Sequence, residues 1–178
     1  MRESNGFTLI ELLIVVAIIG IIAAIAVPGL LRARMAGNEA SGLGSLRAIN
    51  SGQVSFASSC AHNGYATKLE DLAKMPTDGG QGFISPDLGV NDAVKSGYKV
   101  RLEADAGGFP AGGKAVGDTT TSCNATAPWS GYYGSAIPLV FNATGTRSFA
   151  TDARGTIFYA VDALAPANPL TSSMTPVQ

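Results

Sequence analysis

Charged residues are scarce in this sequence of 178 residues, where Lys, Arg, Asp and Glu together make up 14%. The net charge is -1, so the chain lacks the basic excess that marks a nucleic-acid-binding protein. There is one histidine, His62, and no second histidine that would complete a metal site with it. These shortages argue against nucleic acid as a partner and against a histidine-based metal or catalytic centre.

Motifs for catalysis and cofactor binding are also missing. The sequence holds no Gly-x-Ser-x-Gly nucleophile motif. Segment 108–115 approaches a phosphate-binding loop, but it lacks the Ser or Thr that binds magnesium, and no apolar helix follows it. Four aspartates lack the spacing of a calcium loop: Asp78, Asp87, Asp92 and Asp118. We therefore predict no enzyme activity, no cofactor and no metal site.

The strongest feature that is present is an apolar run near the N-terminus. From Leu12 to Val27 the side chains are only those of Leu, Ile, Val, Ala and one Gly. As a helix, residues 7–27 would span ~31 Å, which is about the thickness of a bilayer core. A helix that is apolar all round lies in lipid or is buried by other helices. Glu11 is the one ionisable residue of this 7–27 helix and lies near its N-terminal end. A carboxylate inside a membrane helix costs roughly 2.5–3.5 kcal/mol, so we expect Glu11 to be functional.

The residues around this glutamate carry a family resemblance. Gly6 ends a short polar leader, Phe7 follows it, and Glu11 lies four residues further on, before a run that ends in Ala26-Val27-Pro28. This pattern resembles the N-terminus of type IV prepilins and of the pseudopilins of type II secretion. Residues 64–72 also resemble, more weakly, the loop that follows the long helix in some pseudopilins.

The resemblance implies a maturation and an assembly route. A prepilin peptidase would cut between Gly6 and Phe7 and methylate the new amine of Phe7. The chain would enter the inner membrane as a single-pass precursor with its C-terminal domain outside, and would then polymerise with identical or related pilins, using pilus or secretion machinery. The expected product is an extracellular type IV pilus-like filament. A periplasmic pseudopilin and a minor tip pilin or adhesin are the alternatives.

Glu11 and Pro28 are the residues that we expect to serve assembly. Cleavage creates a positive amine at Phe7, and Glu11 of a neighbouring subunit would pair with it inside the fibre core. The resemblance also implies that the helix around Pro28 loses helicity in the filament.

Two observations complicate this interpretation. Ala24-Ile25-Ala26 also fits the cleavage site of an ordinary secretory signal, although the apolar run is long for one. Arg32 and Arg34 follow the run, whereas the leader carries Arg2 against Glu3, so the positive-inside rule alone favours the opposite orientation.

The two cysteines, Cys60 and Cys123, lie outside the apolar run. An even pair in an exported chain predicts a disulfide. Asn124-Ala125-Thr126 and Asn142-Ala143-Thr144 fit the glycan-acceptor pattern, and turn asparagines are the commoner explanation.

The remaining chain predicts an amphipathic helix that continues the apolar one. Pro28-Gly29 predicts a kink, and helix then resumes to about Ser59. Four apolar residues fall on one face of it: Leu43, Leu46, Ile49 and Phe56. Polar residues fall largely elsewhere: Asn38, Arg47, Asn50 and Gln53. Four glycines weaken this half, so it needs a sheet to pack against.

Further elements follow from alternation and turn residues. Residues 69–74 predict a helical turn, and 78–97 a surface loop. The clearest strand is 98–104, with 137–141 as a second strand whose Pro138 favours an edge or a start. Segments 147–151 and 156–161 predict a hairpin. Between the strands, 106–134 is a long loop that Cys123 would pin, and the tail after Pro166 looks loosely ordered.

We therefore predict an α+β pilin fold, in which the second half of a long N-terminal helix packs on a small antiparallel sheet. The expected division is a leader over 1–6, a transmembrane and polymerisation helix over 7–28, and an exterior domain over 29–178.

Overall fold

The computed structural model describes residues 6–107, 113–171 and 173–177. By internal contacts the chain divides into two compact units, Met1–Arg34 and Met35–Gln178. The helices are α1 (Leu9–Ser59), α2 (Leu69–Ala73) and the 3-10 turn η1 (Pro86–Leu88). The strands are β1 (Ala93–Lys95), β2 (Tyr98–Ala104), β3 (Tyr132–Pro138), β4 (Ser148–Asp152), β5 (Ile157–Ala160) and β6 (Thr175–Pro176).

Helix α1 belongs to both units and ends at Ser59, where the sequence predicts its end. It stays helical through Pro28. After α1, His62 and Asn63 take positive φ, and the amide of Asn63 bonds the carbonyl of Ala57. The backbone therefore reverses at these two residues and not at Gly64, where a Cβ would meet Pro128 at 2.4 Å.

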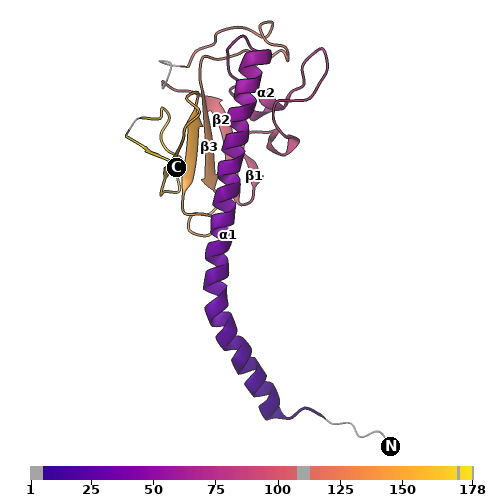
Figure 1. Ribbon diagram of the computed structural model, residues 1–178, viewed down its shortest axis with the longest axis vertical. Coiled ribbons are helices and arrows are strands. Elements are labelled where there is room, and N and C mark those ends of the chain that lie inside the picture. Colours follow the sequence, from indigo (N-terminus) through magenta and orange to yellow (C-terminus); the bar gives the residue numbers. More distant parts are fainter. Residues whose placement is uncertain (1–5, 108–112, 172, 178) are drawn as a thin grey trace, which may run out of the picture. The chain divides into compact units, whose positions relative to one another are not determined.

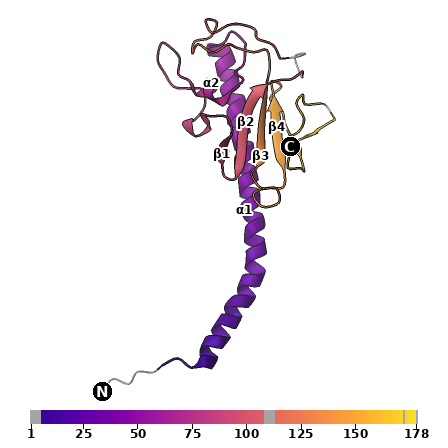
Figure 2. The same cartoon turned by 180° about the vertical axis from the view of Figure 1, so that it is seen from behind.

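The second unit is a six-stranded antiparallel sheet with α1 lying across one face (Figures 1 and 2). The strands follow one another in sequence order, and every neighbouring pair is antiparallel. The core lies between the sheet and α1. It joins Leu46, Ile49 and Phe56 of the helix to Tyr98, Val100 and Leu102 of β2. The predicted α+β arrangement is confirmed.

The 3-10 turn η1 and strand β1 lie in a segment that the sequence predicts as a loop. Strand β1 lies inside 78–97, and three residues are too few for an alternating pattern to show. A tight turn links β1 to β2, with positive φ at both Ser96 and Gly97, as in a type I′ hairpin.

The prediction for β3 is wrong by five residues, because the strand covers Tyr132–Pro138 and not 137–141. All but one of its residues are buried, so its pattern does not alternate. Pro138 ends the strand at a place where it pairs with Tyr98 alone, beyond the reach of β4. Its missing amide hydrogen therefore costs no ladder bond on that side.

The segment after Pro166 packs against the sheet, whereas the sequence predicts that it is loosely ordered. Pro166 and Leu170 are buried. The hydroxyl of Tyr133 donates to the carbonyl of Pro166, and the amide of Val177 donates to Ile157. Leu170 joins Tyr133, Ala150 and Phe158 in a small second core.

The polar residues of α1 also depart from expectation. Gln53 is fully buried, and its amide group exchanges two hydrogen bonds with the backbone of Ala66, at 2.7 and 3.0 Å. The carboxamide oxygen of Asn50 accepts hydrogen bonds from the hydroxyls of Tyr132 and Thr151. Asn50 thus faces the sheet and Gln53 faces the segment between α1 and α2, and each satisfies polar groups that burial would otherwise leave unpaired.

Candidate functional site

The start of α1 is closed by a reciprocal pair of hydrogen bonds. The amide and hydroxyl of Thr8 donate to Oε2 of Glu11 at 2.8 and 2.6 Å, and the amide of Glu11 donates to the Thr8 hydroxyl at 3.3 Å. This is a capping box, in which Thr8 precedes the helix and Glu11 is its third residue. Both Thr8 bonds end on the same oxygen, so Glu11 Oε1 faces outward without a hydrogen bond in the described part of the chain.

The other predicted residues of this segment are open to their surroundings. Gly6 is exposed, and 90% of the surface of Phe7 is accessible. Pro28 is exposed within α1. Apart from its chain neighbours, no atom of the described residues lies within 4 Å of where a Cβ would stand on Gly6. With respect to the described residues, the peptide bond between Gly6 and Phe7 is therefore exposed.

The apolar stretch that follows is uncovered as well. Among the described residues, α1 is the one helix that is long and apolar enough to cross a membrane by length and composition, and none of its most apolar window is buried within the chain. At least half of the surface of these side chains is accessible: Leu9, Ile10, Leu12, Leu13, Ile14, Val15, Val16, Ile18, Ile19, Ile21, Ile22, Ile25, Val27, Leu30 and Leu31. Such a surface requires lipid or other helices around it.

The long loop before β3 is fastened to the end of α1. Cys60 and Cys123 form the predicted disulfide, with Cα atoms 4.8 Å apart. The amide of Cys123 also bonds the carbonyl of Cys60 at 3.1 Å, and Nδ1 of His62 lies 2.8 Å from the carbonyl oxygen of Thr121. The loop therefore rests on the helix end, as the sequence predicts.

One candidate glycan acceptor, Asn124, lies next to the disulfide and is buried. The side chain of Asn124 is buried and donates to the carbonyl of Asp71 at 2.7 Å. The other, Asn142, is exposed at a turn with positive φ.

A buried carboxylate ties α1 to the segment between β3 and β4. Glu39 is 6% exposed and accepts hydrogen bonds from the amide and hydroxyl of Thr146 and from Nε of Arg147, all at 2.8 Å. Nη2 of Arg147 completes the ion pair at 2.7 Å. Burial raises the pKa of Glu39, but the bonds from Thr146 and Arg147 outweigh it, so the pKa lies below its ordinary value.

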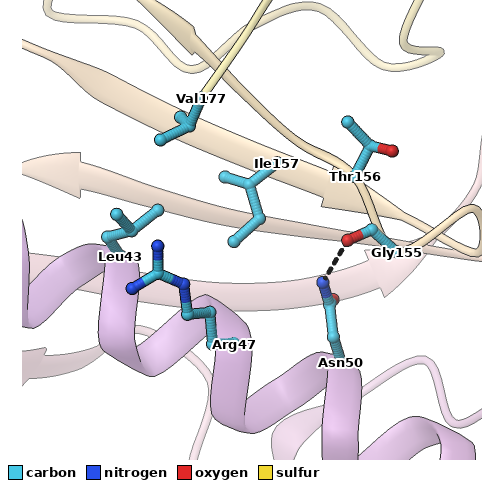
Figure 3. Close-up of a pocket in the computed structure, with 7 residues that line it drawn as sticks. All are labelled: Leu43, Arg47, Asn50, Gly155, Thr156, Ile157 and Val177. Carbon is cyan, nitrogen blue, oxygen red and sulfur yellow. Dashed lines mark hydrogen bonds between the residues drawn. The ribbon is translucent and has the colours of Figure 1, made fainter.

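A cleft of about 370 Å³ opens between α1 and the β4–β5 hairpin (Figure 3). Leu43, Arg47 and Asn50 line it from the helix, and the Asn50 amide donates to the carbonyl of Gly155 at 2.9 Å. Arg47 is its one charged lining residue, and no carboxylate, thiol or imidazole accompanies it there. The cleft thus lacks the paired groups that acid–base or nucleophilic catalysis needs.

Two of the loop aspartates named in the sequence analysis, Asp87 and Asp118, bond to a lysine and to threonines. Asp87 pairs with Lys95, and Asp118 accepts bonds from Thr120 and Thr121. Within the described ranges, no group of three or more His, Cys, Asp or Glu is placed to hold a metal ion. Residues 108–112 of the phosphate-loop-like segment, and residues 1–5 of the leader, lie outside the described residues.

Comparison with known proteins finds similarity to the N-terminal segment of this chain. A family model for the prokaryotic N-terminal methylation motif matches residues 1–27. The type IV wide pilus major component PilA4 of Thermus thermophilus is 62% identical over 39 residues, which are 22% of this chain and 30% of that protein. The type IV major pilin protein PilA of Myxococcus xanthus is 47% identical over 56 residues, 32% of this chain and 26% of that protein. No solved structure matches significantly.

The capped start of α1 and much of its apolar stretch lie within the segment that matches the methylation motif, and an α+β unit follows it. Over its N-terminal segment, the chain is similar to these two type IV pilins. The matched stretches span less than a third of either relative, so the similarity does not extend to most of the second unit, Met35–Gln178, which is called the exterior unit below.

Two residues of the site escaped the sequence analysis. The sequence does indicate the role of Thr8, since Thr-x-x-Glu before an apolar run is the capping-box pattern. No sequence pattern indicates the role of Glu39, because its partners lie more than 100 positions away in the chain.

Proposed function

We propose that this chain is a structural subunit of a type IV pilus-like filament, processed by a prepilin peptidase and assembled through α1. The observation that carries the proposal is the uncovered apolar stretch of α1, most of which lies within the segment that matches the methylation-motif model. The two relatives are named as major pilus components, which favours a pilus over a secretion pseudopilin.

For processing, residues 1–6 are a leader that the peptidase removes, and the new amine of Phe7 is methylated. Gly6 has no side chain, and the peptide bond after it is exposed. Gly6→Val should leave full-length precursor in the membrane. Intact-mass analysis of wild type should give a chain that begins at methylated Phe7; retention of Met1, or a cut after Ala26, contradicts the proposal.

For assembly, we assign Glu11 to pairing with the Phe7 amine of a neighbouring subunit. The Thr8 bonds stabilise the carboxylate in the isolated subunit, while Oε1 stays open to a further donor. Inside an apolar fibre core, an opposite charge within a few ångströms offsets the desolvation that either group alone would bear.

The test of this pairing is fibre formation by Glu11→Ala in cells without wild-type subunits. The variant should insert, be cleaved and fold its exterior unit, yet enter sheared fibres poorly. Thr8→Val is the matched variant, because it removes the cap and keeps the carboxylate. If Thr8→Val lowers fibre yield as much as Glu11→Ala, capping explains the effect. Wild-type fibre yield from Glu11→Ala would refute the charge pairing.

Pro28 is assigned a role in the same assembly. It has no amide hydrogen to bond the carbonyl one turn before it, and Gly29 follows. The helix is therefore weakest there, which would let α1 adapt its length and direction as subunits pack. Pro28→Ala should retain insertion and cleavage but give fibres with altered subunit spacing by electron microscopy.

The location follows from the proposed role: the inner membrane before assembly, with the exterior unit outside, and the cell surface afterwards. Mass spectrometry of sheared surface fibres tests it. The chain as the main component indicates a major pilin. A trace at fibre ends indicates a minor tip subunit, and its absence from fibres, with retention in the periplasm, indicates a pseudopilin.

A further inference from the structure

Arg47 is an exposed cation whose side chain rises from α1 into the cleft beside the β4–β5 hairpin (Figure 3). It forms no ion pair or side-chain hydrogen bond within the described ranges. Leu43, Ile157 and Val177 give the cleft apolar walls. A guanidinium group binds carboxylates through a planar fork of donors, and the attraction is stronger where apolar walls exclude water. The cleft therefore suits a carboxylate that the described part of the exterior unit does not itself place there.

Asp78 is the exposed carboxylate of the exterior unit that is left without a partner. It has no ion pair or side-chain hydrogen bond in the part of the chain that the structure describes. Each of the other exposed carboxylates of this unit accepts a hydrogen bond or forms an ion pair: Glu70, Asp87, Asp92, Asp118 and Asp162. Arg47 and Asp78 are thus two opposite charges that remain unpaired in a single copy.

The chain holds Asp78 at the tip of a short turn, which we call the Asp78 turn (residues 76–79). The amide of Gly79 donates to the carbonyl of Pro76 at 3.2 Å, and Thr77 bonds the carbonyl of Cys123 through its amide and its hydroxyl. Gly79 has positive φ, and apart from its chain neighbours no described atom lies within 4 Å of its Cβ position. The turn is therefore fixed at its base and narrow at its tip, as entry into a cleft of about 370 Å³ requires.

The cleft and the Asp78 turn lie on opposite flanks of α1. The segment that follows the turn packs on α1 at Gly52, where a Cβ would lie 2.8 Å from the carbonyl oxygen of Phe83. Gly52 is five residues after Arg47, which is ~140° around the helix. The sheet shows the same division, because η1 forms an ion pair with β1 at one edge, while β5, next to the other edge, lines the cleft. The two charges therefore do not meet within one copy.

We propose that, in the filament, Asp78 of one subunit enters the cleft of a neighbouring subunit and pairs with Arg47 there. This inference rests on the proposed filament function. A donor and an acceptor on opposite flanks make a heterologous contact, which repeats from copy to copy and gives an open assembly instead of a closed dimer. Charge complementarity at such a contact fixes the register between neighbours.

Charge exchange tests the pair in cells without wild-type subunits, with the yield of sheared fibres measured against total subunit. The variants are Arg47→Asp, Asp78→Arg and the two combined. Each single variant should lower the yield at least about tenfold, because like charges then face each other at every contact. The combined variant restores opposite charges and should recover most of the yield. Lys114→Asp is the matched control and should behave as wild type, because Lys114 is also an exposed cation without an ion pair among the described residues.

Disulfide formation and thermal unfolding in detergent show whether each variant folds. If Arg47→Asp is misfolded, Arg47→Gln takes its place, since it removes the charge and keeps a long polar side chain. Wild-type fibre yield from a folded Arg47 variant overturns the inference and leaves the filament function intact. Loss in both single variants without recovery in the combined one also overturns it, and assigns the cleft to another anion. A wild type that forms no fibres contradicts the filament function and the inference together.

Discussion

Glu39 shows how a single buried charge holds a loop in place. Its carboxylate joins α1 to Thr146 and Arg147, and the Arg147 guanidinium also lies 5.6 Å from the ring centres of Phe149 and Tyr159. Hydrogen bonds to charged groups contribute more than neutral ones, and an unpaired buried partner is costly. Glu39 thus helps to hold the β3–β4 loop against α1, together with the bonds from Asn38 to Thr144 and from Tyr98 to Arg147.

Glu39→Gln should lower the free energy of unfolding by about 2 kcal/mol at neutral pH, because the ionised acceptor is lost. The pKa of Glu39 lies below its ordinary value of 4.5. Its contribution is therefore complete above pH 4.5 and is lost as the pH falls through the folded-state pKa. The gap between wild type and variant, measured by thermal unfolding of detergent-solubilised protein, should close in acid. Glu70→Gln, at an exposed carboxylate with one bond from Asn91, should cost under about 1 kcal/mol.

The sequence predicts residues whose role depends on near neighbours, and misses those whose partners are distant. Gly6, Phe7 and Glu11 form a motif within six positions. Gln53, in contrast, is an ordinary polar residue on a helix until the fold brings the backbone of Ala66 beside it. Burial of such a group is set by the tertiary partner, which no helical period reveals.

At the scale of elements, the four glycines in the second half of α1, Gly37, Gly42, Gly44 and Gly52, separate into two kinds. A Cβ on Gly42 would lie 2.9 Å from a ring carbon of Tyr98, and one on Gly52 would lie 2.8 Å from the carbonyl oxygen of Phe83. Nothing lies within 4 Å at Gly37 or Gly44. Two of the four glycines therefore permit close contact between α1 and the rest of the exterior unit.

Gly42→Ala should destabilise the protein by about 1–3 kcal/mol, because the added methyl group overpacks the contact with Tyr98. Gly44→Ala is its matched control and should stabilise by up to about 1 kcal/mol through helix propensity. Thermal unfolding of both variants checks the difference. A loss at Gly44 equal to that at Gly42 would contradict the packing argument.

The disulfide is the second element-scale constraint. Its cysteines are 63 positions apart, and closing a loop of that length restricts the unfolded chain by about 4 kcal/mol in the chain-entropy account. Reduction should lower unfolding stability by up to that amount. Limited proteolysis of reduced protein should cut first between residues 113 and 130, where few backbone groups belong to a strand. First cleavage in β4 or β5 would assign the disulfide another role.

The strand predictions succeed where one face of a strand is buried and the other is not. β2 alternates apolar and charged residues, so both of its bounds are predicted correctly. β3 is buried on both faces by the helix on one side and the 164–170 segment on the other, and its Tyr, Gly, Ser and Ala give no period. A central strand rich in small residues is indistinguishable from a loop by this criterion.

At the scale of the whole molecule, the exterior unit carries its own core. The first buried residue of α1 is Glu39, and α1 is exposed before Met35. Removal of residues 1–34 should therefore give a soluble, monodisperse protein that keeps the disulfide and unfolds within a few degrees of the full chain in detergent. Size-exclusion chromatography and near-UV circular dichroism check this. Aggregation of the truncated protein would show that the removed segment supports the fold.

The order of the strands has a consequence for export. Each strand pairs with the one synthesised just before it, and α1 comes first. A chain that crosses the membrane from its anchored end would deliver the helix, then β1 to β6, in the order in which the sheet grows. Most neighbouring strands are joined by short connections, so their contacts form with little loss of loop entropy; the pairs β2–β3 and β5–β6, which longer segments separate, are the exceptions. Folding can keep pace with translocation, and the sheet exposes one unpaired growing edge at a time until the final strand arrives.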